Sequence, residues 1–196
     1  MQRLKIQLFG SFQVTLDDMI LEKFRTDKAR ALLAYLAVEG QRSHRREALA
    51  TLLWGSSPQK AARASLRTAL SNLRKILAPI ETRAPFLITT RQTVMLNTAH
   101  PDCWIDVVEF DRLVHAHQTH MHRGLIHCAE CRQRLIRMTE LYEGALLSGL
   151  TLSDSLSFDE WEIVEQQARH SHILEALAIL VEHHRIVGHY DQIERY

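Results

Sequence analysis

Histidine and cysteine are concentrated in one short stretch of the 196-residue chain. Residues 115–131, HAHQTHMHRGLIHCAEC, hold five of the twelve histidines and two of the three cysteines. Imidazoles and thiolates at short spacings are typical of tetrahedral zinc sites, and structural sites take four such ligands. The pattern HxHx5CxxC therefore predicts one structural zinc ion held by His120, His122, Cys128 and Cys131.

Other interpretations of this cluster stay open. Free surface imidazoles and thiols are one alternative, because metal-like spacing is common without metal. His127 is a substitute ligand, whereas we expect His115 and His117 on a solvated helix face. A CxxC pair at a helix start can also serve redox exchange, although the adjacent histidines favour coordination. A hydrolytic zinc enzyme needs an open coordination position. Four protein ligands leave none, so we predict no catalytic residues and no enzyme.

Basic and short polar side chains follow one face of residues 57–77, SPQKAARASLRTALSNLRKIL. Ser57 and Pro58 mark a helix start, and Pro79 marks its end. A face with arginines and without acidic residues suits the major groove of DNA, where Arg reads guanine and Asn reads adenine. A solvated surface helix is the alternative, but such faces usually mix Glu with Lys. The opposite face is an apolar stripe of Ala62, Leu66, Ala69, Leu70, Leu73 and Leu77.

The polar side chains divide into two predicted roles. Those at the flanks would neutralise phosphates, and those at the centre would approach base edges. Arg91, in a turn further along the chain, could enter a neighbouring minor groove. The phosphate set is Lys60, Arg63, Arg74 and Lys75, and the base-edge set is Arg67, Thr68, Ser71 and Asn72.

The elements before and after this helix complete a recognisable layout. Three helices with short connections, the third polar on its outer side and followed by a hairpin, indicate a winged helix-turn-helix. Alternating residues predict the strands, and caps or glycines bound the helices. The expected elements are a hairpin within 3–16 broken at Gly10-Ser11, a turn at Asp17-Asp18, an edge strand within 20–24, a helix capped by Thr26 or Asp27 and ended by Gly40, a helix from Ser43 to Trp54-Gly55, and strands at 86–88 and 94–96 around residues 90–92.

The charge of the chain is divided unevenly between its halves. Residues 1–100 hold 16 Lys and Arg against 7 Asp and Glu, and the remainder holds 8 against 16. A polyanionic partner is therefore expected for the first half only. Neither a signal peptide nor a membrane-spanning run is present in the sequence, so we expect a cytoplasmic protein without a membrane partner.

From Trp104 onward the chain is expected to be almost wholly helical. Amphipathic faces occur within 107–114, 135–142 and 173–181, and Gly188-His189-Tyr190 is typical of a turn inside a helical repeat. We expect the sequence to stop inside such a repeat, which a following segment would cover. The sequence contains no GxxxxGK[ST] nucleotide-binding loop.

The motifs KARALLAYLAVEG, RREALATLLW and ARASLRTALSNLRKIL, with the hairpin, resemble the OmpR-type winged-helix domain of SARP-like regulators. WIDVVEF, LYEGALLSG and SFDEW are similar to the family's bacterial transcriptional activation domain, which is similar to tetratricopeptide (TPR) repeats. The resemblance implies a transcriptional activator that binds double-stranded DNA, RNA polymerase as a partner, and homodimers on direct repeats. Larger members share the HxHR…CxxC arrangement. One departure is the turn at residues 90–93, which lacks the glycines common in the family.

The predicted fold is mostly α with a small β component. Residues 1–100 would form the OmpR-type winged helix, and residues 101–196 an all-α, TPR-like domain. The predicted function is sequence-specific regulation of transcription, with helix 58–77 in the major groove. The alternative is a TPR-type interaction scaffold whose winged helix binds protein. The net charge of +9 in the first half favours DNA.

Overall fold

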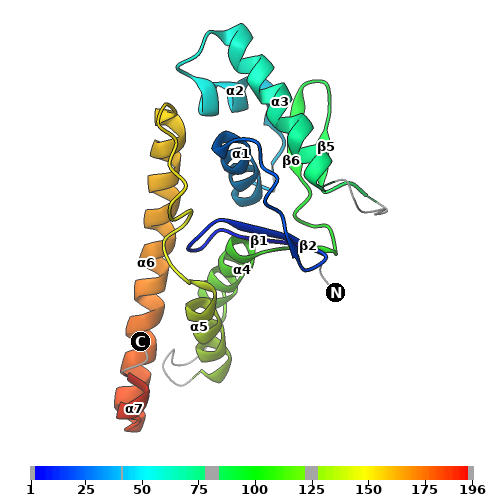
Figure 1. Cartoon of the computed structure of the whole chain (residues 1–196). Helices are drawn as coiled ribbons and strands as arrows, with labels where there is room; N and C mark the ends of the chain where they lie inside the picture. The colour runs from blue at the N-terminus through cyan, green and yellow to red at the C-terminus, as the bar shows by residue number, and fades with distance from the viewer. Residues whose placement is uncertain (1–2, 41, 78–83, 122–127, 194–196) are drawn as a thin grey trace.

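The computed structural model describes residues 3–40, 42–77, 84–121 and 128–193. Two small sheets and helices α1 to α3 form one end of the molecule, and α4 to α7 extend away from it (Figure 1). This architecture confirms the predicted mostly α fold with a winged helix. The elements are β1 Leu4–Gln7, β2 Gln13–Leu16, β3 Met19–Ile20, α1 Asp27–Val38, β4 His44–Arg45, α2 Arg46–Trp54, α3 Gln59–Leu77, β5 Leu87–Thr89, β6 Thr93–Leu96, β7 Cys103–Ile105, α4 Asp106–Gln118, α5 Ala129–Leu141, α6 Leu156–Val187 and α7 Tyr190–Ile193.

The first sheet has the strand order β3-β2-β1-β7. Asp17 and Asp18 turn the chain between β2 and β3 with φ angles of 50° and 63°, as a tight hairpin turn requires. On its other edge β1 pairs in parallel with β7, with Leu4 opposite Cys103. The expectation of helix from Trp104 was therefore wrong at its start, because this residue lies in a strand. The sheet takes a strand from beyond residue 100, and the division of the chain there stays a prediction.

The hydroxyl of Thr26 caps α1 by accepting a hydrogen bond from the Ala29 amide at 3.2 Å. This confirms the predicted helix start. The expected Ser43 cap of α2 was wrong, because His44 and Arg45 pair with β6 and the helix begins only after them. Arg45 occupies the N-cap position and makes no side-chain capping bond.

Gly40 follows α1 without the left-handed backbone that the sequence suggested. A Cβ atom on this residue would lie 2.1 Å from Cγ2 of Thr98. Close approach of another segment, and not a positive φ, is what requires glycine at this position. Further along, the Pro58 carbonyl accepts the Ala62 amide at 3.0 Å and so opens α3. The predicted stop at Pro79 lies outside the described residues.

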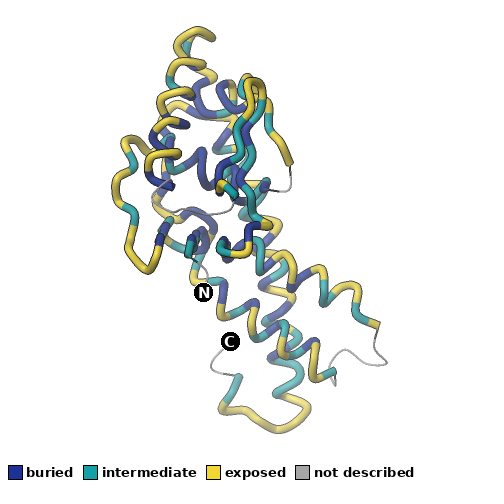
Figure 2. The backbone as a smooth tube through the Cα atoms, turned by 90° about the vertical axis from the view of Figure 1, so that its right-hand side faces the viewer, coloured by how far each residue is buried: buried dark blue, intermediate teal, exposed yellow. Residues whose placement is uncertain are grey.

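A single apolar cluster runs through the described part of the chain (Figure 2). The leucines of the predicted α3 stripe belong to it, since Leu66, Leu70 and Leu73 are at most 2% exposed. The cluster continues into α4, where Phe110 is fully buried. The two halves of the sequence thus share a core, which fixes α3 against the rest of the molecule.

The long helix α6 connects the two ends of the molecule (Figure 1). Near its start the Ser155 hydroxyl donates to the Leu53 carbonyl at 2.8 Å. The Trp161 ring lies 4.9 Å from the ring of Tyr35 on α1. Further along α6, buried Arg169 pairs with Asp111 of α4 at 2.7 Å. None of the helices in the described ranges is both long and apolar enough to cross a bilayer.

Candidate nucleic-acid interface and metal cluster

The outer face of α3 displays almost all of the side chains that the sequence assigned to DNA. Its inner face is held by the leucine stripe, so the outward direction of the polar face is fixed by packing. No acidic residue occurs along the helix. The exposed members of the predicted set on α3 are Lys60, Arg63, Arg67, Thr68, Ser71, Arg74 and Lys75.

Asn72 is the exception, and the base-reading role predicted for it was wrong. Its side chain is 9% exposed and turns toward the segment that precedes α1. Oδ1 accepts the Arg25 amide at 3.1 Å, and Nδ2 donates to the Lys23 carbonyl at 3.3 Å. Because both ends of the amide are used, Asn72 fixes this segment against α3.

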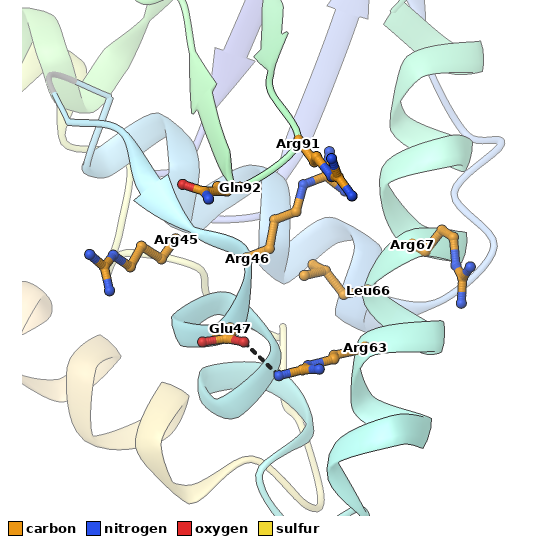
Figure 3. A pocket seen from close by; sticks show the side chains of 8 residues that line it. All are labelled: Arg45, Arg46, Glu47, Arg63, Leu66, Arg67, Arg91 and Gln92. Atoms are coloured by element: carbon orange, nitrogen blue, oxygen red, sulfur yellow. Dashed lines mark hydrogen bonds and ion pairs between the residues drawn. The ribbon is translucent and has the colours of Figure 1, made fainter.

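A hollow of about 520 Å³ separates α3 from the hairpin of β5 and β6, the wing. Figure 3 shows its lining side chains, which come from the start of α2, from α3 and from the wing turn. Three arginines of the predicted set line this hollow. Two arginines outside that set join them, one from α2 and one from the residue before it. The lining residues are Arg45, Arg46, Glu47, Arg63, Leu66, Arg67, Arg91 and Gln92.

Arg45 and Arg46 were not predicted from the sequence, where their signal is a pair of adjacent arginines at the start of a helix. Arg25, which lines a second hollow beside the centre of α3, was not predicted either. Arginines from the segment before α1, from β4, α2 and α3, and from the wing turn line these two hollows, and this arrangement attracts a polyanion. The predicted residues that share the second hollow are Arg67, Thr68, Ser71, Asn72 and Lys75.

The arginines of this surface differ in what holds them. Arg63 pairs with Glu47 at 2.5 Å, and Arg74 donates to the hydroxyl of Thr89 on β5. Arg67 makes no hydrogen bond or ion pair with any described residue. Arg67 is therefore free to bond an external ligand at no cost in internal contacts.

The wing turn closes without glycine. The Thr90 hydroxyl accepts the amides of Gln92 at 3.1 Å and Thr93 at 2.9 Å, and the Thr90 amide donates to the Thr93 carbonyl at 2.9 Å. None of these residues has a positive φ. A threonine side chain thus replaces the conformational freedom of glycine, and Arg91 is exposed at the tip.

Three of the four predicted zinc ligands lie together between α4 and α5. The ligand atoms of His120, Cys128 and Cys131 are within 4.8 Å of one another. The Cys128 sulfur lies 3.4 Å from Nε2 of His120, close to the roughly 3.5 Å between two ligands of tetrahedral zinc. His122 and the substitute His127 lie outside the described residues.

The surroundings of this cluster also suit a cation. Nδ1 of His120 lies 3.7 Å from a carboxylate oxygen of Glu130, so the imidazole nitrogen that does not contact Cys128 faces an acid. The pKa of the Cys128 thiol is lowered, mainly because the Cys131 amide donates to its sulfur. Burial raises the pKa of Cys131, which opposes loss of its proton, so the support for a cation comes from His120, Glu130 and Cys128.

Comparison with known proteins identifies the class of the first half. Residues 23–94 match the family described as "Transcriptional regulatory protein, C terminal". They include α1 to α3 and most of the wing, so this region is similar to OmpR-type winged-helix DNA-binding domains. The family named from the sequence motifs is thereby confirmed for this part of the chain.

One relative that the comparison finds is the regulator EmbR. Over 76 residues the chain is 41% identical to the transcriptional regulatory protein EmbR of Mycobacterium bovis and of Mycobacterium tuberculosis. The aligned residues make up 39% of this chain and 19% of EmbR. The structure of M. tuberculosis EmbR in complex with a low-affinity phosphopeptide matches with a TM-score of 0.65 and 25% identity. That match includes 100% of this chain and 51% of the EmbR chain. The family and these relatives are regulators and not enzymes, in agreement with the prediction.

Proposed function

We propose that the chain is a sequence-specific, DNA-binding transcription regulator whose α3 lies in the major groove. The observation that carries this proposal is the outer face of α3, which is exposed, free of acidic residues and rigidly backed by the core. Short side chains at its centre let the helix approach base edges closely. The proposed base contacts are Arg67, Thr68 and Ser71, and the phosphate contacts are Lys60, Arg63, Arg74 and Lys75, with Arg91 entering the minor groove.

The finer roles are proposals that rest on similarity. EmbR is described as a transcriptional regulatory protein, and the chain spans about half of the solved EmbR structure. On this basis we assign the helical half to contact with other proteins, including RNA polymerase in an activator, and the winged helix to paired binding on direct repeats. A footprint covering two adjacent sites, with two chains per duplex, is the outcome that supports pairing.

Selection of bound duplexes from a random DNA pool tests the proposal. The 196-residue chain, and not its first half alone, is the right reagent, because β7 from residues 103–105 completes the first sheet. We expect one enriched sequence, with retention falling steeply as salt rises because counterions leave the phosphates. Retention that is absent at low salt would instead favour a winged helix that binds protein.

We also propose one structural zinc ion per chain, held by His120, His122, Cys128 and Cys131. Zinc would supply a clamp between the end of α4 and the start of α5, and no catalysis. The support is the 3.4 Å approach of imidazole and thiol and the second thiol beside them. Elemental analysis of protein purified without chelator or metal-affinity resin should give about one equivalent. Much less zinc, with both thiols freely titratable in the folded protein, would leave them as ordinary thiols that hold no metal.

A further inference from the structure

Arg46 holds the wing turn from both sides of Arg91. Its Nε and Nη2 atoms donate to the Thr90 carbonyl at 3.1 Å and 2.8 Å. Its own backbone amide donates to the Gln92 carbonyl at 2.9 Å. The residues directly before and after Arg91 are therefore both bonded to Arg46.

This use of an arginine is electrostatically unusual. The Arg46 guanidinium is held by a neutral carbonyl and lines the same hollow as Arg91 (Figure 3). The acid that lines this hollow, Glu47, is paired with Arg63. Cations placed near one another repel, and an anion in the hollow would relieve that repulsion. The arrangement is therefore better suited to a bound polyanion than to internal stability.

The other side of the wing is tied to α3 through the bond from Arg74 to Thr89 on β5. Arg91 itself is exposed and faces the hollow together with Arg67. The wing tip and α3 are thus linked before any ligand binds. A pre-ordered backbone loses less conformational entropy on binding than a mobile one.

We propose that Arg46 is a positioning residue for DNA binding, which acts by fixing the direction in which the wing presents Arg91. The inference rests on the proposed function, because it assumes that this surface binds DNA. Its two donors form a planar fork on one carbonyl oxygen, a geometry that the single ammonium of lysine does not reproduce. Arg46 would act through Arg91 and not by a contact of its own.

A double-mutant cycle in the 196-residue chain separates these two modes of action. Arg46→Lys keeps the charge and loses the fork, so we expect DNA affinity about 3- to 10-fold lower with an unchanged salt slope. Arg91→Ala should lower affinity at least as much. In the Arg91→Ala background, Arg46→Lys should not lower DNA affinity further, because the Arg91 side chain through which Arg46 acts is already absent. Arg46→Met has neither the charge nor the donors of arginine. In the otherwise native chain, this variant should bind DNA more weakly than Arg46→Lys does.

Two further variants guard the result against a folding defect. Arg45→Ala removes the exposed side chain of a neighbouring arginine of the same hollow, which pairs with the wing at Thr93 through its backbone alone. The fold-loss of DNA affinity caused by Arg45→Ala should multiply with the fold-loss caused by Arg91→Ala. Thr90→Val removes the hydroxyl that closes the turn and should behave as Arg46→Lys does. Unchanged melting temperatures would show that each variant is folded.

The possible outcomes are distinct. Arg46→Lys and Arg91→Ala effects that multiply, with wild-type binding intact, would overturn the positioning role and assign Arg46 a direct contact. A lack of effect of Arg91→Ala would overturn it as well. Failure of the wild-type chain to retain any duplex would instead overturn the proposed function, and this inference with it.

Discussion

Asn72 and Arg67 lie on the same helix and were assigned the same role from sequence, yet their surroundings are opposite. The amide of Asn72 bonds to residues 23 and 25, whereas Arg67 has no partner among the described residues. Position 72 borders the apolar stripe, where periodicity alone does not decide between inside and outside. Only the path of a distant segment, which crosses α3 at this point, assigns the amide to the fold.

This difference predicts separable effects on DNA binding. Arg67→Ala should relax preference at one base position by about 1 to 3 kcal/mol, because it removes a base-edge contact. Lys60→Ala should weaken binding to all sequences alike and flatten the salt dependence. Affinities for a panel of single-base operator variants at two salt concentrations check both expectations. Equal effects of the two substitutions on every sequence would refute the assigned roles.

Glu47 is expected to weaken DNA binding, because it is an acid in a cationic hollow. It pairs with Arg63 at 2.5 Å, and both side chains are more than half exposed. Glu47→Gln should free Arg63 for a phosphate, raise affinity about 2- to 5-fold and steepen the salt slope by about one. Glu160→Gln makes the same charge change on an exposed residue of α6 and should leave binding unchanged. A gain equal in both variants would point to net charge alone.

Asp106 predicts a pH dependence of stability. Its carboxylate is buried and accepts the amides of Leu8 at 2.7 Å, Phe9 at 2.9 Å and Val107 at 2.7 Å. Burial raises its pKa to about 6, against an ordinary value of 3.8. The folded state therefore binds a proton more tightly than the unfolded state, and this contribution to stability is lost as pH rises from about 4 to about 6.

The expected size of that contribution is roughly 2 to 3 kcal/mol. Urea unfolding of the wild type and of Asp106→Asn at pH 4 and pH 7 measures it. The free energy of unfolding of the wild type, relative to the variant, should be higher at pH 4. The raised pKa of Glu162, about 7, is present in both proteins and cancels in this comparison. A relative stability that increased toward pH 7 would contradict the expectation.

The elements that sequence predicted well are those specified by neighbouring residues. The first hairpin, the Thr26 cap and the two faces of α3 depend on turn chemistry, capping and periodicity within a few residues. The elements that it missed depend on distant partners. The strand β7 has three residues and exists because β1 lies beside it. Ser43 looked like a cap, but pairing of the next two residues with β6 displaced the helix start.

The need for glycine at position 40 also depends on a distant partner, and this dependence can be tested. Gly40→Ala should destabilise the chain by about 1 to 3 kcal/mol, since the added methyl overlaps the Thr98 side chain. Thr98→Ala removes the overlapping atoms and should recover part of that loss in the double variant. Thermal unfolding of the two single variants and the double variant measures the coupling. Additive losses would show that backbone conformation, and not the contact with Thr98, requires the glycine.

The whole molecule places its two candidate sites far apart. Helix α6 and the shared core join the winged helix to α4 and α5, and the cysteine pair lies at the start of α5, an element well away from α3 (Figure 1). The charge difference between the halves follows the same division. The sequence identified both clusters, because each is contained in a short segment. It did not identify the arginine hollow, which is assembled from α2, α3 and the wing.

This separation predicts that loss of the proposed zinc ion affects stability but not DNA affinity. Cys128→Ser should release the metal and lower the melting temperature, because the clamp between α4 and α5 opens. Affinity for DNA should stay within about 2- to 3-fold of the wild type, since distant, independent sites contribute additively. The matched control is Cys103→Ser, a buried thiol in β7 outside the cluster, whose pKa is raised by burial to about 12. That variant should keep its zinc even where it loses stability. Metal retained by Cys128→Ser, or lost from both variants alike, would show that Cys128 is not a ligand.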